Sequence, residues 1–260
     1  MTSEELLRSV PEVAPLDAEL LLARTLDRDR TWVLAHPGSV VPQPAVRRFR
    51  RQAARRATGI PLAYLTGEKE FFGRPFTVTR DVLCPRPDSE LLVERALAWL
   101  RPGDTLVEVG TGSGCIGLSL RLERPGVTAV LTDISPAALA VARVNGHRHA
   151  VPDVRFRLAD GWPKDLGRAP GETVVVANLP YLTPVEADAL PDEPRIALAG
   201  GHDGLHLIRR LVAGLERTAC RPRRVLLEHG PDQAARIRDI VPRPARTHRD
   251  LAGRERVTEY

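Results

Sequence analysis

From residue 104 to the C-terminus, short apolar runs alternate with stretches in which apolar residues recur every three or four positions. Short runs rich in Val, Ile and Leu predict buried strands, and the three-to-four spacing predicts amphipathic helices. Strands and helices in alternation form βαβ units, so we expect an α/β fold with a mostly parallel, doubly wound sheet. We also expect closing edge strands in the last stretch, 247–260. The expected strands are 105–110, 127–134, 154–160, 173–179 and 223–230, and the expected helices are 114–123, 136–149, 204–217 and 232–241.

The first 65 residues show the helical spacing without a convincing strand. Apolar residues recur at helical intervals in LDAELLLARTL (16–26), and PAVRRFRRQAARRAT (44–58) is a second helical stretch between prolines. We therefore predict a small all-helical domain over residues 1–65.

The pattern changes between residues 66 and 84, where two β-prone runs flank Gly73-Arg74-Pro75. We predict a hairpin linker there. A helix is then expected to begin just after Pro87, with Asp88 or Ser89 as its cap and Glu90 near its positive end. Residues 85–260 form the predicted sheet domain.

Composition and charge narrow the class of protein. The chain is 43% hydrophobic with a net charge of +5 and a pI of 9.6, which permits a nucleic-acid partner without requiring one. Its three Cys residues are far apart, which argues against disulfides and a zinc site and for a reducing compartment. The N-terminus lacks a signal-peptide core, and no run approaches the ~20 apolar residues that span a bilayer. We expect a soluble, cytoplasmic monomer without a metal or a membrane partner.

The first strand of the sheet domain runs directly into a glycine-rich turn and a helix, LVEVGTGSGCIGLSL (106–120). Gly110, Gly112 and Gly114 allow a tight turn and a close approach of the backbone to a ligand. The strand carries Glu108, and the next strand ends in Asp133, where a carboxylate would meet ribose hydroxyls. We infer a nucleotide-type cofactor at this turn.

Two features favour S-adenosylmethionine over a dinucleotide. The glycines are spaced Gly-x-Gly-x-Gly rather than Gly-x-Gly-x-x-Gly, and no additional basic residue stands by to meet a pyrophosphate. Carboxylates near the turn suit cationic sulfonium and ammonium groups. A third strand ends in LADGW (158–162), which places Gly161 and Trp162 where they could contact an adenine ring, with Asp160 beside them for hydrogen bonding. Trp162 is equally expected as a core aromatic.

A fourth strand ends in the tetrapeptide Asn178-Leu179-Pro180-Tyr181. Asn and Pro are ordinary turn formers, but here the turn opens at the same edge of the sheet as the glycine turn. The Asn178 side-chain oxygen and the Leu179 carbonyl can accept both N–H groups of a planar nitrogen. Pro180 fixes the backbone, and the Tyr181 ring can stack on the planar group. This arrangement predicts methylation of an amide or a base amine, with catalysis mainly by positioning.

At this point the chain resembles the release factor glutamine methyltransferases, of the PrmC/HemK type, from about residue 10 to the C-terminus. The glycine turn and Asn-x-Pro-Tyr are shared by many amine methyltransferases, whereas the linker motifs are particular to this family. The segments that carry the resemblance are PLAYLTGEKEFFGRPFTV (61–78), PRPDSELLVE (85–94), EVGTGSG (108–114), NLPY (178–181), ALAGGHDGLHLIRRL (197–211), LLEHG (226–230) and DLAGRERV (250–257).

The resemblance implies a Rossmann-like, S-adenosylmethionine-dependent methyltransferase sheet behind a helical N-terminal domain and a hairpin linker. It implies methylation of the Gln side-chain amide in the Gly-Gly-Gln loop of peptide chain release factors, with no obligatory nucleic acid. Asn178, Leu179, Pro180 and Tyr181 would hold the glutamine amide. The residues implied to bind the cofactor are Gly110, Thr111, Gly112, Ser113, Gly114, Asp133, Gly161 or Trp162, and Asn178. Arg86 and Glu90 would lie near the pocket without a specified role.

One departure keeps an alternative open. The family usually has Pro at the position of Leu179, and Asn-Leu-Pro-Tyr also resembles adenine dimethyltransferases that act on ribosomal RNA. The alternative is therefore a methyltransferase of adenine or another nucleic-acid amine, which the basic pI also favours. A third possibility, a binding module without catalysis, predicts cofactor binding without turnover. The linker motifs and the N-terminal position of the helices favour the glutamine methyltransferase.

Overall fold

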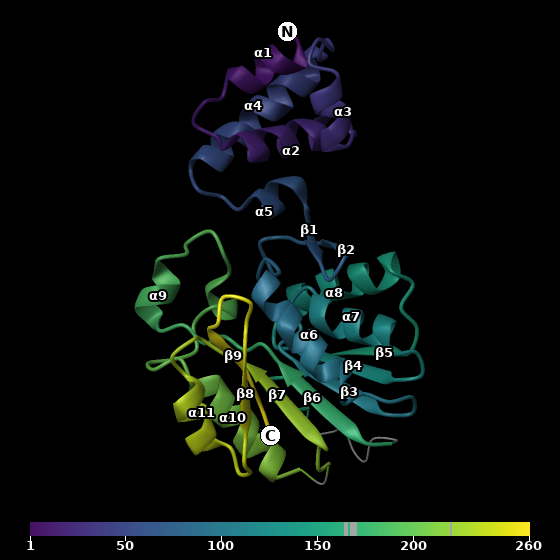
Figure 1. The fold of residues 1–260 in the computed structure, drawn as a ribbon, viewed down its shortest axis with the longest axis vertical. Coiled ribbons are helices and arrows are strands. Elements are labelled where there is room, and N and C mark those ends of the chain that lie inside the picture. The colour runs from purple at the N-terminus through teal and green to yellow at the C-terminus, as the bar shows by residue number, and fades with distance from the viewer. Residues whose placement is uncertain (164–165, 167–170, 219) are drawn as a thin grey trace. The chain divides into compact units, whose positions relative to one another are not determined.

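The structure, a computed structural model, describes residues 1–163, 166, 171–218 and 220–260 (Figure 1). These residues form two compact units, Met1–Glu68 and Lys69–Tyr260. Within the described ranges, no helix is both long enough and apolar enough to cross a membrane.

The first unit is built from helices that bury one face each. Leu21, Leu22 and Phe49 are fully buried in its core, whereas Arg47 and Arg51 are exposed on the other face of the fourth helix. The helices expected at 16–26 and 44–58 are α2 and α4. The helices of this unit are α1 (Ser3–Arg8), α2 (Pro15–Leu26), α3 (Arg30–Ala35), α4 (Gln43–Ala57) and α5 (Leu62–Thr66).

A two-stranded hairpin follows, made of β1 (Glu68–Phe71) and β2 (Arg74–Thr77). Its turn residues Phe72 and Gly73 are both left-handed, with φ of 50° and 70°, the backbone that matches the twist of a two-residue hairpin. The hairpin expected in this region is therefore present, and the turn lies one residue earlier than Gly73-Arg74-Pro75. Phe71 and Phe76 bury their rings in the core of the second unit.

The second unit contains a seven-stranded sheet in the order β5-β4-β3-β6-β7-β9-β8. The strands from β3 to β7 pair in parallel, and β9 pairs antiparallel to both β7 and β8. The strands are β3 (Thr105–Val109), β4 (Thr128–Asp133), β5 (Val154–Leu158), β6 (Thr173–Ala177), β7 (Arg224–Glu228), β8 (Arg246–Arg249) and β9 (Glu255–Glu259). The α/β, Rossmann-like prediction is confirmed. Of the two closing strands, β8 forms the edge and β9 lies inside the sheet.

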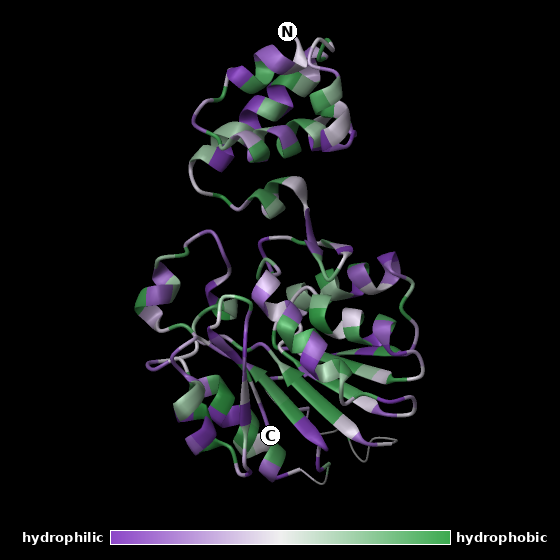
Figure 2. Cartoon of the chain, in the orientation of Figure 1, coloured by the Kyte–Doolittle hydropathy of each residue, from purple (hydrophilic) through white to green (hydrophobic). Residues whose placement is uncertain are grey.

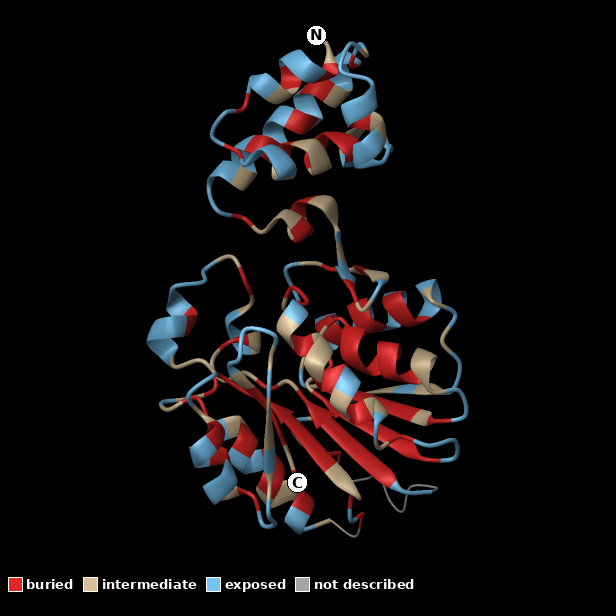
Figure 3. Cartoon of the chain, in the orientation of Figure 1, coloured by how far each residue is buried: buried red, intermediate tan, exposed pale blue. Residues whose placement is uncertain are grey.

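Helices cover both faces of this sheet, which is why β3 and β6 are buried at every position and are mostly apolar (Figures 2 and 3). Along β6, Val174 and Val176 pack with the cluster under α6 and α7, and Val175 packs with the cluster under α10 and α11. The helices of this unit are α6 (Glu90–Leu97), α7 (Cys115–Glu123), α8 (Pro136–Arg148), α9 (Pro184–Asp188), α10 (His206–Glu216) and α11 (Ala234–Ile240), with 3-10 turns η1 (Pro87–Ser89) and η2 (Arg195–Ala197).

The strand order reverses between β3 and β6, which are neighbours in the sheet although β4 and β5 lie between them in sequence. Chain segments leaving the carboxyl ends of these two strands diverge to opposite sides, and such a switch point leaves a crevice for a ligand. The glycine turn follows β3 and the tetrapeptide at 178–181 follows β6. The topology therefore brings the two sequence motifs to one place.

Candidate active site

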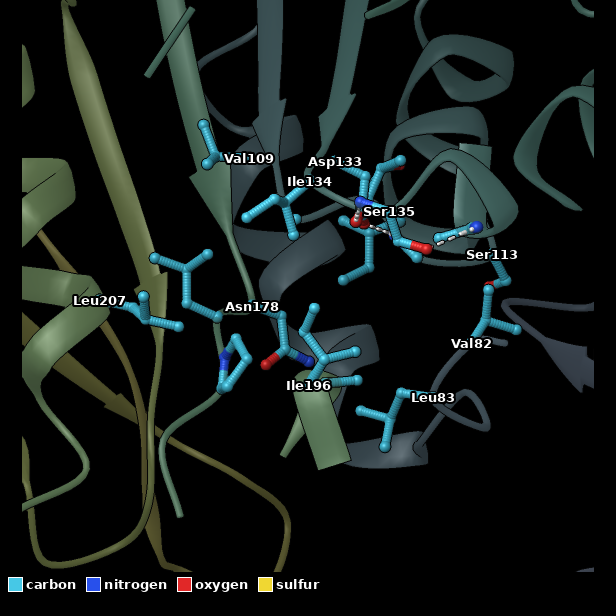
Figure 4. Close-up of a pocket in the computed structure, with 18 of the residues that line it drawn as sticks. Val82, Leu83, Val109, Ser113, Asp133, Ile134, Ser135, Asn178, Ile196 and Leu207 are labelled. Carbon is cyan, nitrogen blue, oxygen red and sulfur yellow. Dashed lines mark hydrogen bonds between the residues drawn. The ribbon is translucent and has the colours of Figure 1, made fainter. Parts of the chain in front are cut away.

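A cavity of about 330 Å³ lies at the carboxyl ends of β3, β4 and β6 (Figure 4). Its volume falls within the range of small-molecule sites. Its walls come from the glycine turn, the ends of three further strands, the segment before η1 and the segment around η2. The main lining segments are 81–86, 109–113, 133–135, 159–161, 178–180 and 196–197.

The glycine turn is held against the neighbouring strand by its own backbone. Gly110 and Thr111 both donate hydrogen bonds to the Thr132 carbonyl, at 2.9 and 2.8 Å. Gly110 has a φ of 77°, and a Cβ at this position would lie 3.1 Å from Leu179 Cδ2. Glycine is required here because the backbone is left-handed and the side chain of the tetrapeptide packs against it.

Glu108 supports this turn from below and is not one of the residues that line the cavity. Its Oε2 accepts hydrogen bonds from the Thr111 hydroxyl and, at 3.1 Å, from the Gly117 amide. Burial raises the pKa of Glu108 to about 8. A Cβ on Gly117 would lie 2.4 Å from the same oxygen, so the helix backbone sits directly on the carboxyl group. We infer that Glu108 fixes the shape of the turn.

Asp133 points into the rim of the cavity from the end of β4 (Figure 4). Its two oxygens accept hydrogen bonds from the Gly112 amide, at 2.8 Å, and from the Ser135 amide, at 2.9 Å. These bonds fix the carboxylate while leaving lone pairs for a ligand. Beside it, the side chain of Ile134 is half exposed and lines the cavity. Ile134 was not predicted to line the site, because a single apolar residue after a strand forms no distinctive sequence pattern.

The structure separates the two residues predicted to meet an adenine ring. Gly161 lines the cavity with a left-handed φ of 80°, and neighbouring Asp160 forms an ion pair with Arg210 of α10, at 2.7 Å. Trp162 is only 7% exposed and packs in the core cluster under α10. It is not among the residues that line the cavity. Of the two roles that the sequence left open for Trp162, the core position is the one observed.

Asn178, Leu179 and Pro180 all line the cavity, opposite the glycine turn. The Asn178 side-chain nitrogen donates to Ser89 Oγ at 3.1 Å. The Leu179 side chain is buried against Gly110, and within the described residues no donor binds its carbonyl oxygen. Tyr181 is not among the lining residues. Burial raises the pKa of Tyr181 to about 12, with the charge of Glu228 as the next cause.

A glycine-rich loop, 199–204, packs against the backbone of the tetrapeptide. A Cβ on Gly200 would lie 2.3 Å from the Pro180 carbonyl oxygen, and one on Gly204 would lie 2.2 Å from the Tyr181 carbonyl oxygen. The Gln233 side chain donates to the same Tyr181 oxygen at 2.9 Å. The glycines of AGGHDG thus allow this loop to pack closely against the tetrapeptide. The sequence alone did not predict this role, because the two segments are distant along the chain.

Arg86 and Glu90 had no specified role from the sequence. In the structure, each forms a bond to a residue in a different segment of the chain. Arg86 lines the cavity and forms an ion pair with Glu193, whose side chain is buried. Glu90 accepts a hydrogen bond from the Phe72 amide at 2.9 Å and so fixes the hairpin turn. The cap prediction is confirmed in position only: Ser89 is the N-cap residue of α6, but its side chain makes no capping hydrogen bond because it binds Glu228 instead.

His229 has a structural position just after β7. It is fully buried, with Nδ1 2.7 Å from the Gly230 carbonyl and Nε2 2.9 Å from Thr258 Oγ1. Burial lowers its pKa, so the neutral ring is favoured, with Nδ1 as donor and Nε2 as acceptor.

Comparisons with known proteins match both parts of the chain. The family model described as the PrmC N-terminal domain matches residues 2–67, and the methyltransferase small domain matches residues 87–185. A release factor glutamine methyltransferase of Bordetella pertussis is 39% identical over 259 residues, covering 95% of each chain. One of Burkholderia pseudomallei is 40% identical and covers 92% of this chain and 87% of its own. A methyltransferase structure from Pyrococcus furiosus shares the fold, with 19% identity, a TM-score of 0.51, and coverage of 74% of this chain and 89% of that one.

Proposed function

The chain belongs to the release factor glutamine methyltransferase family, and on this premise we propose that it methylates the Gln side-chain amide in the Gly-Gly-Gln loop of peptide chain release factors. The observation that carries the proposal is the position of Asn178, which lines the switch-point cavity across from the glycine turn. We further propose residues 1–65 as a helical domain, 66–84 as a hairpin linker and 85–260 as the methyltransferase domain.

S-adenosylmethionine is the methyl donor, and the cavity fits it. Gly110 has a left-handed φ of 77°, as expected of a tight glycine turn at a cofactor site, and Asp133 holds lone pairs toward the rim for hydroxyl groups. We assign cofactor binding to Gly110–Gly114, Asp133, Gly161 and Asn178, and leave Trp162 out because it packs in the core. The cofactor supplies a methyl group on a positively charged sulfur, which leaves as a neutral thioether.

The glutamine amide is a poor nucleophile because its nitrogen lone pair is delocalised, so the site must orient it. The Asn178 side-chain oxygen and the Leu179 carbonyl are placed to accept the two N–H groups of the substrate amide. Pro180 restricts the backbone that carries this carbonyl. Tyr181 is proposed to stack on the amide plane, which requires its ring to move into the cavity from its place beside Gly230. Held in this way, the amide nitrogen would present its lone pair for methyl transfer, and positioning would supply most of the rate.

No strong general base is needed. When the amide nitrogen forms its new bond to carbon it becomes cationic, and it then releases a proton to solvent. This agrees with the residues around Asn178, where the buried carboxylate of Glu228 binds Ser89 and does not line the cavity.

The second candidate, methylation of a nucleic-acid amine, rests on Leu179 in place of the family's Pro and on the basic pI of 9.6. Because the required acceptor is a backbone carbonyl, Leu179 supplies it as well as Pro would. We favour the release factor, and with it a cytoplasmic enzyme that needs no nucleic acid, because release factors act where proteins are made. We also propose that the enzyme acts as a monomer.

The test is methyl transfer from labelled S-adenosylmethionine to a purified release factor. A Gln→Ala variant of the Gly-Gly-Gln loop and a total RNA sample serve as parallel acceptors. Label on the intact factor alone supports the proposal. Label on RNA, or equal label on the Gln→Ala factor, overturns it in favour of the second candidate.

A further inference from the structure

Behind Asn178, three side chains from distant parts of the chain form a hydrogen-bonded row. The Asn178 side-chain nitrogen donates to Ser89 Oγ at 3.1 Å, and Ser89 Oγ donates to Glu228 Oε1 at 3.0 Å. Ser89 and Glu228 are each only 2% exposed, so water does not compete for these bonds. Asn178 follows β6, Ser89 is the last residue of η1, just before α6, and Glu228 ends β7.

The chemistry of these groups fixes the direction of every bond in the row. An ionised carboxylate can only accept, so the single hydroxyl hydrogen of Ser89 is committed to Glu228. The Ser89 oxygen can then only accept from Asn178. The Asn178 carboxamide must therefore present its NH₂ group to Ser89, which leaves its oxygen as the free atom. If the amide were turned over, two oxygen lone pairs would face each other.

Resting on the proposed function, we propose that Ser89 and Glu228 are positioning residues that hold the Asn178 oxygen toward the substrate amide. They act through Asn178: Glu228 does not line the cavity, and Ser89, which does, uses its hydroxyl group to bind Asn178 and Glu228. The sequence did not assign these contacts: Ser89 was expected as a helix cap, and Glu228 as a strand-end residue that could brace the crevice from below.

The groups around Glu228 brace the row from several elements. Arg256 of β9 binds Asp88, the residue before Ser89, at 2.9 Å, and also binds Asp250 at 3.2 Å. Arg254 joins the same two carboxylates. This explains why PRPDSE, LLEHG and DLAGRERV occur together in one chain: their side chains meet behind the tetrapeptide.

The hydrogen-bonded row predicts that activity depends on pH, because it requires an ionised Glu228. Burial raises the pKa of Glu228 to about 7, against the Ser89 hydrogen bond and the Arg256 charge, which lower it. The other titratable groups that face Glu228 are Asp88, Tyr181 and Cys115. Protonated Glu228 can donate to Ser89, which frees the Ser89 hydroxyl and removes the constraint on the amide. Activity should therefore fall as the pH drops below about 7.

The experiment compares Ser89→Ala, Ser89→Thr and Glu228→Gln with the wild-type full-length chain, using a release factor as substrate. Ser119→Ala is the matched control, because Ser119 is equally buried and, among the described residues, its hydroxyl has no hydrogen-bond partner. We expect Ser89→Ala to lower kcat about 30- to 100-fold, as for a misplaced catalytic group, with cofactor affinity within about twofold. Ser89→Thr, which keeps the hydroxyl, restores much of kcat, and Ser119→Ala stays near wild type.

The pH profile separates positioning from a merely structural role. Between about pH 6 and about pH 9, wild-type kcat should show an acidic limb that Glu228→Gln lacks. The inference is overturned if Ser89→Ala retains kcat within about threefold of Ser119→Ala. If Ser89→Ala does not fold, an identical acidic limb in wild type and Glu228→Gln overturns it instead. If the wild type methylates no release factor, the proposed function is rejected. The wild-type reaction in the same assay therefore tests the proposed function independently of the Ser89 and Glu228 variants.

Discussion

The backbone of Gly200 lies directly against the carbonyl oxygen of Pro180, so closely that a Cβ on Gly200 would stand 2.3 Å from it. A second backbone atom, the Gly204 carbonyl oxygen, would be 2.6 Å from the same Cβ. Neither neighbour is a flexible side chain that could move aside. The loop at 199–204 therefore fixes the turn that presents Asn178 and Leu179 to the cavity.

Replacing Gly200 with Ala should accordingly displace the tetrapeptide. We expect Gly200→Ala to lower kcat by about 100-fold and the free energy of unfolding by about 1–3 kcal/mol. Gly38→Ala is the matched control, because no atom lies within 4 Å of its Cβ position, and it should change stability by less than about 1 kcal/mol. Steady-state kinetics and urea denaturation check both. Full activity in Gly200→Ala would show that the loop does not constrain the turn.

Asn178 tests whether the cavity catalyses transfer or only binds the cofactor. Removing its carboxamide deletes one of the two acceptors for the substrate amide, so we expect Asn178→Ala to lose about 100- to 1000-fold in kcat, by analogy with deleting one oriented hydrogen-bonding group from an active site. Equilibrium binding of S-adenosylmethionine should fall much less. Wild-type turnover in this variant would contradict the role given to Asn178.

Trp162 should matter for stability and not for cofactor affinity. Trp162→Phe leaves a smaller ring in the core cluster under α10, and we expect a loss of about 1–2 kcal/mol in the free energy of unfolding. Because Trp162 does not line the cavity, calorimetry should give a dissociation constant for S-adenosylmethionine within about twofold of wild type. A tenfold weaker affinity in the folded variant would place Trp162 at the cofactor after all.

Glu108 makes stability depend on pH. Burial raises its pKa from 4.5 to about 8, so the folded chain holds a proton that the unfolded chain releases between these values. The free energy of unfolding should therefore fall as pH rises through this window, by at most about 1.4 kcal/mol per pH unit from this group. Glu108→Gln cannot titrate and should lose this part of the slope, whereas the exposed control Glu12→Gln should keep it. Parallel slopes in urea titrations of wild type and Glu108→Gln would rule the effect out.

The sheet domain was predictable because its central strands are buried on both faces. That burial forces continuous apolar runs such as Val174–Val176, and the glycine turn after β3 has its own local pattern. The segment containing α9 and η2 was not predicted, since it is short and carries no sustained periodicity.

Within the site, local motifs were readable and long-range partners were not. Asp88 and Ser89 have the residue types of a helix cap, yet Ser89 is 139 positions from Glu228, to which it donates. No local sequence pattern identifies a partner so distant along the chain. The position of Trp162 was open for the same reason: its packing is decided by α10, about fifty residues later in the chain.

The most direct test of the account is to map the methyl group by tandem mass spectrometry after incubating a release factor with the enzyme and S-adenosylmethionine. The account predicts a single added methyl on the side-chain amide nitrogen of the Gln in the Gly-Gly-Gln loop, absent when Asn178→Ala replaces the wild type at equal enzyme and time. A methyl group on another residue, or transfer only to RNA in the parallel reaction, would contradict it.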